Sequence, residues 1–461
     1  MEMAGPFALL CELVLRETAM FAAFGFLLLG AGDLAVDFIW MGGIAKRGLS
    51  GRDRPRACAA SLEPARKPGR LAIFIPAWDE AAVIGDMLDH ARAAFGAADH
   101  VIYVGCYPND PATIEAVRAA GGERVRLVIG PAPGPTSKAD CLNRIWDRMV
   151  EDEAAEGRRF KAVVLHDAED VVHSAELRLF DALIERFDLV QLPVVPLIDP
   201  HSRWIGGHYA DEFAEAHGKE LVVREALGAS VPSAGVGCAI SREALAALAD
   251  DQGAPFDPGS LTEDYELGLR LRALGRRAAF VRLPGGPGKP VVATRGYFPS
   301  TLDAAVGQKA RWMTGIALTG WDRLGWSGGL AERWMRLRDR QSLFAALILF
   351  AAYVALALWT VLFVAELVAD RAMRPVPPFL AVLLTVNLAL LVWRVGMRFG
   401  FVTRVHGWRE GLRSIPRVVV GNAIAMLAAR RALARYLRIR RTGASEWNKT
   451  AHAFPRQLPA E

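Results

Sequence analysis

Three stretches of the chain are apolar enough for the interior of a bilayer, and a fourth is amphipathic. They run from about Thr18 to Trp40, from Gln341 to Val368 and from Val376 to Met397. Each holds the roughly twenty apolar residues that a crossing requires. From Ile415 to Tyr436 arginines interrupt an apolar run that is too short to span. The pattern predicts three transmembrane helices and one helix lying in the membrane interface.

Between the first two apolar stretches, short apolar runs alternate with segments of helical length. Such runs, bounded by turn residues, predict buried strands. The predicted strands are Leu71–Ile75, Val101–Gly105, Val125–Val128, Lys161–Leu165 and Leu189–Val195. Regular alternation with helices predicts βαβ units, a mainly parallel sheet and hence an α/β domain. No Gly-x-Gly-x-x-Gly or Gly-x4-Gly-Lys-Ser/Thr loop follows the first strand, which argues against dinucleotide-binding and P-loop functions.

These patterns divide the chain into four regions. Residues 1–45 form an N-terminal transmembrane segment, 46–335 a soluble domain, 336–400 a transmembrane hairpin, and 401–461 the interfacial helix and a tail. The 461-residue length, the hydrophobic fraction of 52% and the mean hydropathy of +0.20 agree with one catalytic domain plus membrane segments.

The charge distribution and the cysteines indicate where the soluble domain lies and which kinds of binding site are not expected. The net charge is +5, and arginines gather beside the apolar stretches. By the positive-inside tendency the soluble domain is cytoplasmic, and the charge forms no stripe of the kind that binds nucleic acid. The 5 cysteines show no Cys-x-x-Cys spacing, so neither a disulfide framework nor a zinc site is indicated.

The fourth predicted strand ends in an acidic segment that contains Asp167 and Glu169. Open α/β sheets bind ligands at the carboxyl ends of their strands, and alternate residues of an extended backbone point the same way. Two carboxylates on one side suit Mg2+ or Mn2+ held against a diphosphate, with Lys138 as a further phosphate contact. A solvated acidic turn is the alternative interpretation, and Lys138 alone equally fits an ordinary residue in a first helical turn.

Thr262, Glu263 and Asp264 follow a Pro/Gly loop and open a predicted helix. Thr262 is the expected N-cap. A carboxylate held at a helix start is well placed as a general base, and Asp264 is the candidate, with Glu263 beside it. The alternative is that both acids merely complement the helix dipole.

Gln308, Arg311 and Trp312 share one face of a later predicted helix, because they are spaced i, i+3 and i+4. An indole stacks on the apolar face of a sugar, and the amide and guanidinium hold polar groups. An amphipathic interfacial helix is the alternative for this segment.

In this order, the three motifs resemble those of family-2 glycosyltransferases of the membrane-embedded, polysaccharide-synthase type. The segments Tyr107–Thr113, His166–His173 and Trp447–Pro455 are similar to the inner-membrane branch of that family first named for phage adsorption. The resemblance implies a GT-A type nucleotide-sugar-binding domain. Glu169 departs from the usual second aspartate of the metal motif.

The resemblance also implies further site residues. The usual acidic motif after the second strand is missing, and Asp110 is the candidate to bind base and ribose. After an interfacial helix, the tail is expected to fold over the nucleotide. The donor-binding set is Pro76, Trp78, Glu80, Asp110, Lys138, Asp167, Gln308, Arg311, Trp312, Trp447, Lys449 and Thr450.

The implied activity is inverting transfer of a sugar from a nucleotide-sugar, with a UDP-sugar as the guess, to a growing exported polysaccharide at the bacterial inner membrane. Transfer of one sugar to a lipid carrier is the alternative enzyme function. A non-catalytic part of a surface-receptor or secretion assembly is the alternative of another class. Three crossings make a narrow channel, so an export partner or a homo-oligomer is expected. The chain ends too soon for the C-terminal domain with which relatives sense a cyclic dinucleotide.

Overall fold

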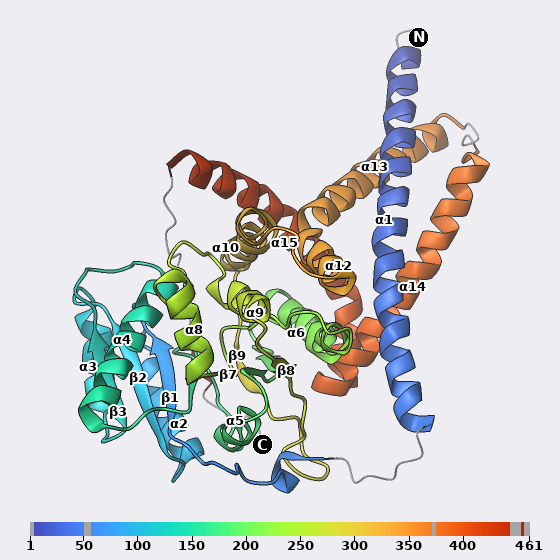
Figure 1. Ribbon diagram of the computed structural model, residues 1–461. Coiled ribbons are helices and arrows are strands. Elements are labelled where there is room, and N and C mark those ends of the chain that lie inside the picture. Colours follow the sequence, from blue (N-terminus) through green and yellow to red (C-terminus); the bar gives the residue numbers. More distant parts are fainter. Residues whose placement is uncertain (1–3, 50–56, 371–374, 443–452, 456–461) are drawn as a thin grey trace.

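A computed structural model describes residues 4–49, 57–370, 375–442 and 453–455. Figure 1 shows an α/β domain at the lower left and long helices at the upper right, with shorter helices between them. The expected α/β architecture with a mainly parallel central sheet and long apolar helices is confirmed.

The central sheet has seven strands in the order β3-β2-β1-β4-β7-β5-β8. The strands β1 to β4 are mutually parallel, whereas β7 runs antiparallel to both of its neighbours, β4 and β5. The strands are β1 (Leu71–Pro76), β2 (His100–Cys106), β3 (Val125–Ile129), β4 (Ala162–Leu165), β5 (Leu189–Gln191), β7 (Cys238–Ser241) and β8 (Ala278–Phe280).

Helices cover both faces of this sheet, because alternate residues of the buried strands point to opposite sides. From β1, Ile73 and Ile75 pack on the side of α2, and Ala72 and Phe74 pack on the side of α4. The helices of this domain are α2 (Ile84–Phe95), α3 (Pro111–Ala120), α4 (Lys138–Glu156), α5 (Glu176–Leu183), α8 (Arg242–Gln252) and α9 (Glu263–Ala273). The carboxyl ends of β1 and β4 therefore open at one edge of a fully covered sheet.

The strand expected over Leu189–Val195 is in fact two strands, and this expectation is corrected. β5 ends at Gln191, and β6 (Val194–Leu197) pairs instead with β9 (Thr294–Tyr297) in a separate two-stranded sheet. Pro193 separates them and has no N–H to donate to a ladder. The chain can therefore leave the central sheet here, which brings β9 beside the carboxyl end of β4.

Among the residues that the structure describes, four helices are long and apolar enough to cross a membrane. They are α1 (Ala4–Leu49), α13 (Ser342–Val368), α14 (Pro378–His406) and α15 (Trp408–Thr442). The first three contain the predicted spans. α15 turns away from α14 at Gly407, whose φ is +86°, and runs past α6 and α10 (Figure 1). Its apolar window has the lowest hydropathy of the four, 1.3. The expectation that this run is too short to cross is wrong, because α15 has 35 residues. Its interfacial placement stays a prediction.

Two carboxylates inside α1 fasten it to the rest of the molecule. Asp37 pairs with Lys219 at 2.5 Å, and Asp33 pairs with Arg338 at 2.9 Å and Arg394 at 2.7 Å. Buried acids of this kind persist where opposite charges face them. These pairs join α1 to the π-helix η2 (Ala216–Glu220), to α12 (Leu330–Arg340) and to α14.

The remaining helices lie between the sheet and the membrane helices. They are α6 (Ile205–Glu215), α7 (Leu221–Ala226), α10 (Leu302–Met313), the π-helix η3 (Thr314–Thr319) and α11 (Gly320–Leu324). The short helix η1 (Ala59–Ser61) lies instead on the α/β domain, where Arg178 of α5 donates hydrogen bonds to its carbonyl oxygens.

Candidate active site

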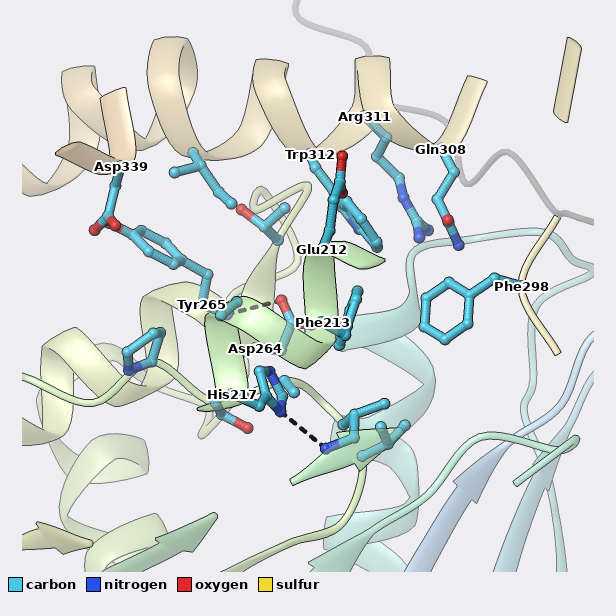
Figure 2. Close-up of a pocket in the computed structure, with 18 of the residues that line it drawn as sticks. Glu212, Phe213, His217, Asp264, Tyr265, Phe298, Gln308, Arg311, Trp312 and Asp339 are labelled. Atoms are coloured by element: carbon cyan, nitrogen blue, oxygen red, sulfur yellow. Dashed lines mark hydrogen bonds between the residues drawn. The ribbon is translucent and has the colours of Figure 1, made fainter. Parts of the chain in front are cut away.

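A cavity of about 770 Å3 extends from the strand tips to the membrane helices. Figure 2 shows side chains from α6, α9, α10 and α12 converging on it. Its walls include Pro76, Asp167, Glu169, Asp264, Trp312, Asp33 and Arg394. The acidic turn, the candidate base and the α10 face, separated by about 140 residues in sequence, thus line one space.

Asp167 and Glu169 do not lie on an extended strand as predicted. β4 ends at Leu165, and a turn follows. Asp170 forms this turn, because its Oδ2 accepts hydrogen bonds from the backbone N–H of Asp167 (3.0 Å) and from His166 Nδ1 (2.9 Å). The two side chains nevertheless reach the same cavity.

His166 holds the acidic turn in place through its two ring nitrogens. Its Nε2 lies 2.7 Å from Glu176 Oε1, so both ring nitrogens face carboxylates. Burial opposes the charged imidazole, but Glu176 and Asp170 outweigh it and raise the pKa of His166 to about 10. A charged imidazole donates from both nitrogens, which holds the backbone of the acidic turn in place.

Lys138 stands between the acidic groups of the cavity. It begins α4, whose N-cap Ser137 accepts a hydrogen bond from the backbone N–H of Asp140. The Lys138 Nζ lies 2.6 Å from Asp167 Oδ1. Burial opposes its charge, but Asp167, Glu263 and Asp264 together hold the pKa of Lys138 above its ordinary value.

The carboxylates of the acidic turn suit a divalent cation whose remaining coordination positions are filled by substrate. In the described residues no group of three or more His, Cys, Asp or Glu side chains is placed to hold a metal ion. Asp167 and Glu169 supply two carboxylates, and the Asp167 side chain is 35% exposed. Mg2+ and similar hard cations bind through one or two carboxylates, water and substrate phosphates, so the residues present fit such an ion.

The candidate base lies at the start of α9. Thr262 occupies the N-cap position, as predicted, although its hydroxyl makes no capping hydrogen bond. The hydroxyl packs on Gly315, where a Cβ would lie only 2.5 Å away. Asp264 Oδ1 accepts a hydrogen bond from the backbone N–H of Tyr265 at 2.7 Å. Gly235, with φ of +74°, leaves room for the other oxygen, since a Cβ there would lie 2.8 Å from Asp264 Oδ2.

Both acids of this pair are harder to ionise than usual. Burial raises the pKa of Asp264. Burial and the neighbouring charge of Asp264 raise the pKa of Glu263 to about 7. The charge of Lys138 opposes both shifts. A carboxylate with a raised pKa is a stronger base once it is ionised.

Replacing Lys138 with methionine is expected to move the acidic limb of the pH–rate profile upward. The base works ionised, so turnover rises with pH through its pKa. Loss of the positive charge of Lys138 raises that pKa, because Lys138 favours the ionised form of the base. The measurement is nucleotide release against pH. Lys309→Met, which removes a charge paired with Glu212 across the cavity, is the control and should leave the midpoint unchanged; an unmoved limb in Lys138→Met would contradict the assignment.

Gln308, Arg311 and Trp312 all line the cavity from α10, as their spacing predicts. Trp312 stands edge-on to Tyr209, with ring centroids 6.0 Å apart. In the part of the chain that the structure describes, Gln308 Oε1 and Arg311 Nε are buried without a hydrogen-bond partner. Buried polar atoms are normally paired, so both are suited to contact a bound ligand.

The other predicted donor-site residues divide into two groups. Pro76 and Glu80 line the cavity, whereas Trp78 packs edge-on against Tyr107 at 5.3 Å and does not. Asp110 also lies outside the lining. Its Oδ1 accepts from the backbone N–H of Thr113 as the cap of α3. The role of Asp110 in base and ribose binding stays a prediction.

The predicted capping residues Trp447, Lys449 and Thr450 lie outside the described residues. Just beyond them, Phe454 packs against His90 of α2, with ring centroids 6.1 Å apart. Pro455 is buried. The described end of the chain therefore lies on the catalytic domain.

The sequence analysis missed the residues that α6 and its continuation contribute. Glu212, Phe213 and His217 line the cavity, and Phe298 faces Phe213 with ring centroids 5.0 Å apart (Figure 2). Burial and the charge of Arg282 lower the pKa of His217 to about 3. Its Nδ1 accepts a hydrogen bond from a backbone N–H, so it is neutral. Only the i, i+4 spacing of Phe213 and His217 on a helix hints at a shared face.

The fold and cavity define a class of protein: a nucleotide-sugar-binding α/β domain joined to apolar helices. The family model described as "Glycosyltransferase like family 2" matches residues 68–315, more than half of the chain. The chain therefore belongs to the family-2 glycosyltransferases.

Relatives and solved structures agree with this assignment. The chain is 38% identical over 451 residues to bacteriophage adsorption protein B of Escherichia coli K12 and to bacteriophage N4 adsorption protein B of Escherichia coli O157:H7. Each alignment covers 92% of this chain and 60% of the relative, so the chain spans about three fifths of their length. The resemblance to the branch named for phage adsorption is thus confirmed.

A mannosyltransferase from Pyrobaculum calidifontis, solved in complex with GDP-Man and Mn2+, has a similar fold. The TM-score is 0.53 at 17% identity, and the match covers 90% of this chain and 99% of that chain. At this identity the similarity establishes the fold alone.

Proposed function

We propose that the protein is an inverting glycosyltransferase that extends a polysaccharide at the cytoplasmic face of the bacterial inner membrane. The donor is a nucleotide-sugar, for which a UDP-sugar is the working choice. Asp264 takes the proton from the acceptor hydroxyl, Lys138 and Arg311 bind the donor phosphates, and Trp312 stacks on a sugar ring. Mg2+ or Mn2+ held by Asp167 and Glu169 would supply charge stabilisation for the diphosphate.

The observation that carries this proposal is the continuity of the cavity. It contains the acidic turn, Asp264 and the α10 face, and it reaches Ala345 of α13 and Arg394 of α14. A donor at the strand tips and an acceptor approaching from the membrane helices would meet at Asp264. A single displacement with Asp264 as the base would invert the anomeric centre.

The test is nucleotide release from the purified full chain in detergent, with panels of UDP- and GDP-sugars and with Mg2+, Mn2+ or chelator. Release with one donor, and its loss on chelation, is the expected result. A folded protein that binds none of these nucleotides would contradict the proposal. Analysis of the anomeric configuration of the product tests inversion separately.

The acceptor is tested by the form of the product. Label in a polymer that grows with time supports polysaccharide extension. Label confined to a single-sugar lipid extract would instead support transfer to a lipid carrier, which the membrane end of the cavity also suits. An oligomer or an export partner is expected in the first case, because few helices enclose the path.

A further inference from the structure

A second, smaller cavity lies on the far side of α10 from the candidate active site. Its volume is about 290 Å3. Its lining is Leu302, Asp303 and Val306 from α10, and Leu427, Arg430 and Arg431 from α15. With 3.6 residues per turn, these α10 positions lie opposite Gln308, Arg311 and Trp312. One helix therefore separates this space, the α10–α15 pocket, from the active site.

The α10–α15 pocket combines apolar walls with an unbalanced positive charge. Arg431 pairs with Asp303 at 2.6 Å. Within the described residues Arg430 is exposed and has no ion-pair partner in the structure. Leu302, Val306 and Leu427 form the rest of the wall. This chemistry suits a ligand with an anionic head and an alkyl part.

The surroundings of the pocket have the composition of a membrane interface. Leu433 and Leu437 on α15 are about half exposed, at 50% and 47%, and Trp321 on α11 is 46% exposed. Tyr436 donates a hydrogen bond to Asp322 Oδ2 at 2.7 Å, which ties α15 to α11. Further arginines follow Arg430 and Arg431 on α15: Arg435, Arg438, Arg440 and Arg441. Exposed leucines and arginines along one helix are typical of contact with anionic lipid.

We propose that the α10–α15 pocket binds the headgroup of an anionic phospholipid, with Arg430 on the phosphate and the acyl chain along Leu302, Val306 and Leu427. Binding itself is independent of glycosyl transfer. Its consequence rests on the proposed function: a lipid that bridges α10 and α15 holds the α10 face that lines the active site.

The contact between the two helices explains this consequence. Small residues meet there: Ala305 and Ala310 of α10 pack among Ala428 and Ala432 of α15. The hydroxyl of Thr314, just after α10, lies 2.7 Å from the carbonyl oxygen of Ala310 and 3.3 Å from that of Ala432 on α15. A ligand bound at the edge of this packed seam would contact both helices and so add to the restraint on α10.

Lipid retention tests the site directly. The full chain in detergent is incubated with phosphatidylglycerol or with phosphatidylcholine of the same acyl chains, and bound lipid is counted by native mass spectrometry. We expect the wild type to retain phosphatidylglycerol preferentially. Arg430→Gln should lower that retention about fivefold, the worth of one arginine at an anionic surface. Arg430→Lys should preserve it.

Arg409→Gln is the matched control, because Arg409 is an exposed arginine at the other end of α15 and should leave retention unchanged. Equal retention of the two lipids, or no loss in Arg430→Gln, would overturn the proposal. The proposal would also be overturned if inorganic phosphate raised the melting temperature of the protein as much as phosphatidylglycerol does. The pocket would then be a site for free anions.

The rate of nucleotide release in membranes provides a second test of the lipid site. In phosphatidylcholine nanodiscs, added phosphatidylglycerol should raise nucleotide release by the wild type and by Arg409→Gln, but not by Arg430→Gln. If no protein releases nucleotide in any membrane, the proposed function fails, while lipid retention still decides the binding site.

Discussion

Asp264→Asn is expected to abolish nucleotide release almost completely, by about 10²- to 10⁴-fold, which is the usual contribution of a general base. The amide preserves size and shape but cannot accept a proton at neutral pH. The neighbouring glycine, Gly235, still leaves space for it. Donor binding should survive, because the phosphate contacts proposed for Lys138 and Arg311 are unchanged. The measurement is the steady-state rate together with nucleotide affinity for the folded variant.

Asp250→Asn provides the matched control, since Asp250 is exposed on α8 and away from the cavity. It should turn over at the wild-type rate. If Asp264→Asn retained more than a tenth of the activity at a wild-type melting temperature, another group would have to be the base. Glu263→Gln, on the adjacent residue, would then become the decisive variant.

Asp167→Asn should give the second large loss, about a hundredfold or more, as expected when one charge-stabilising group is removed from a site. The substitution removes an anionic oxygen that suits a hard cation and also frees Lys138 from its ion pair. The concentration of Mn2+ that gives half-maximal release should therefore rise. Measuring release against Mn2+ concentration separates this effect from damage to the base.

Glu151→Gln, at an exposed position on α4, changes a carboxylate outside the cavity and should leave the metal dependence unaltered. An unchanged half-maximal Mn2+ concentration in Asp167→Asn would argue against a metal-binding role for the acidic turn. Glu169→Gln, which alters the second candidate ligand, should shift the metal dependence in the same direction as Asp167→Asn.

Much of the fold could be predicted because it depends on local patterns. Buried strands such as Ala162–Leu165 are short apolar runs, and the long apolar stretches that form α13 and α14 stand out by length and composition. Pro193 marks where the local pattern failed, because an apolar run alone does not reveal which partner strand each part will pair with.

The residues of the candidate site could be predicted where they belong to short sequence motifs. Asp167, Asp264 and Trp312 each belong to such a motif, and all three line one cavity. Their catalytic roles remain predictions. Phe213 and His217 carry no motif, because an aromatic residue and a histidine on a helix are ordinary until packing turns them toward a ligand space.

The order of the residues alone determined a mainly parallel α/β domain with acidic residues after a buried strand and apolar helices beside it, because hydrophobic periodicity and side-chain chemistry are local properties. Tertiary packing decided the rest. It turned the acidic segment on Asp170 and His166, set Lys138 against Asp167, and seated α10 on α15. These contacts join residues far apart in sequence, and their energies depend on burial and mutual distance, which exist only once the chain has folded.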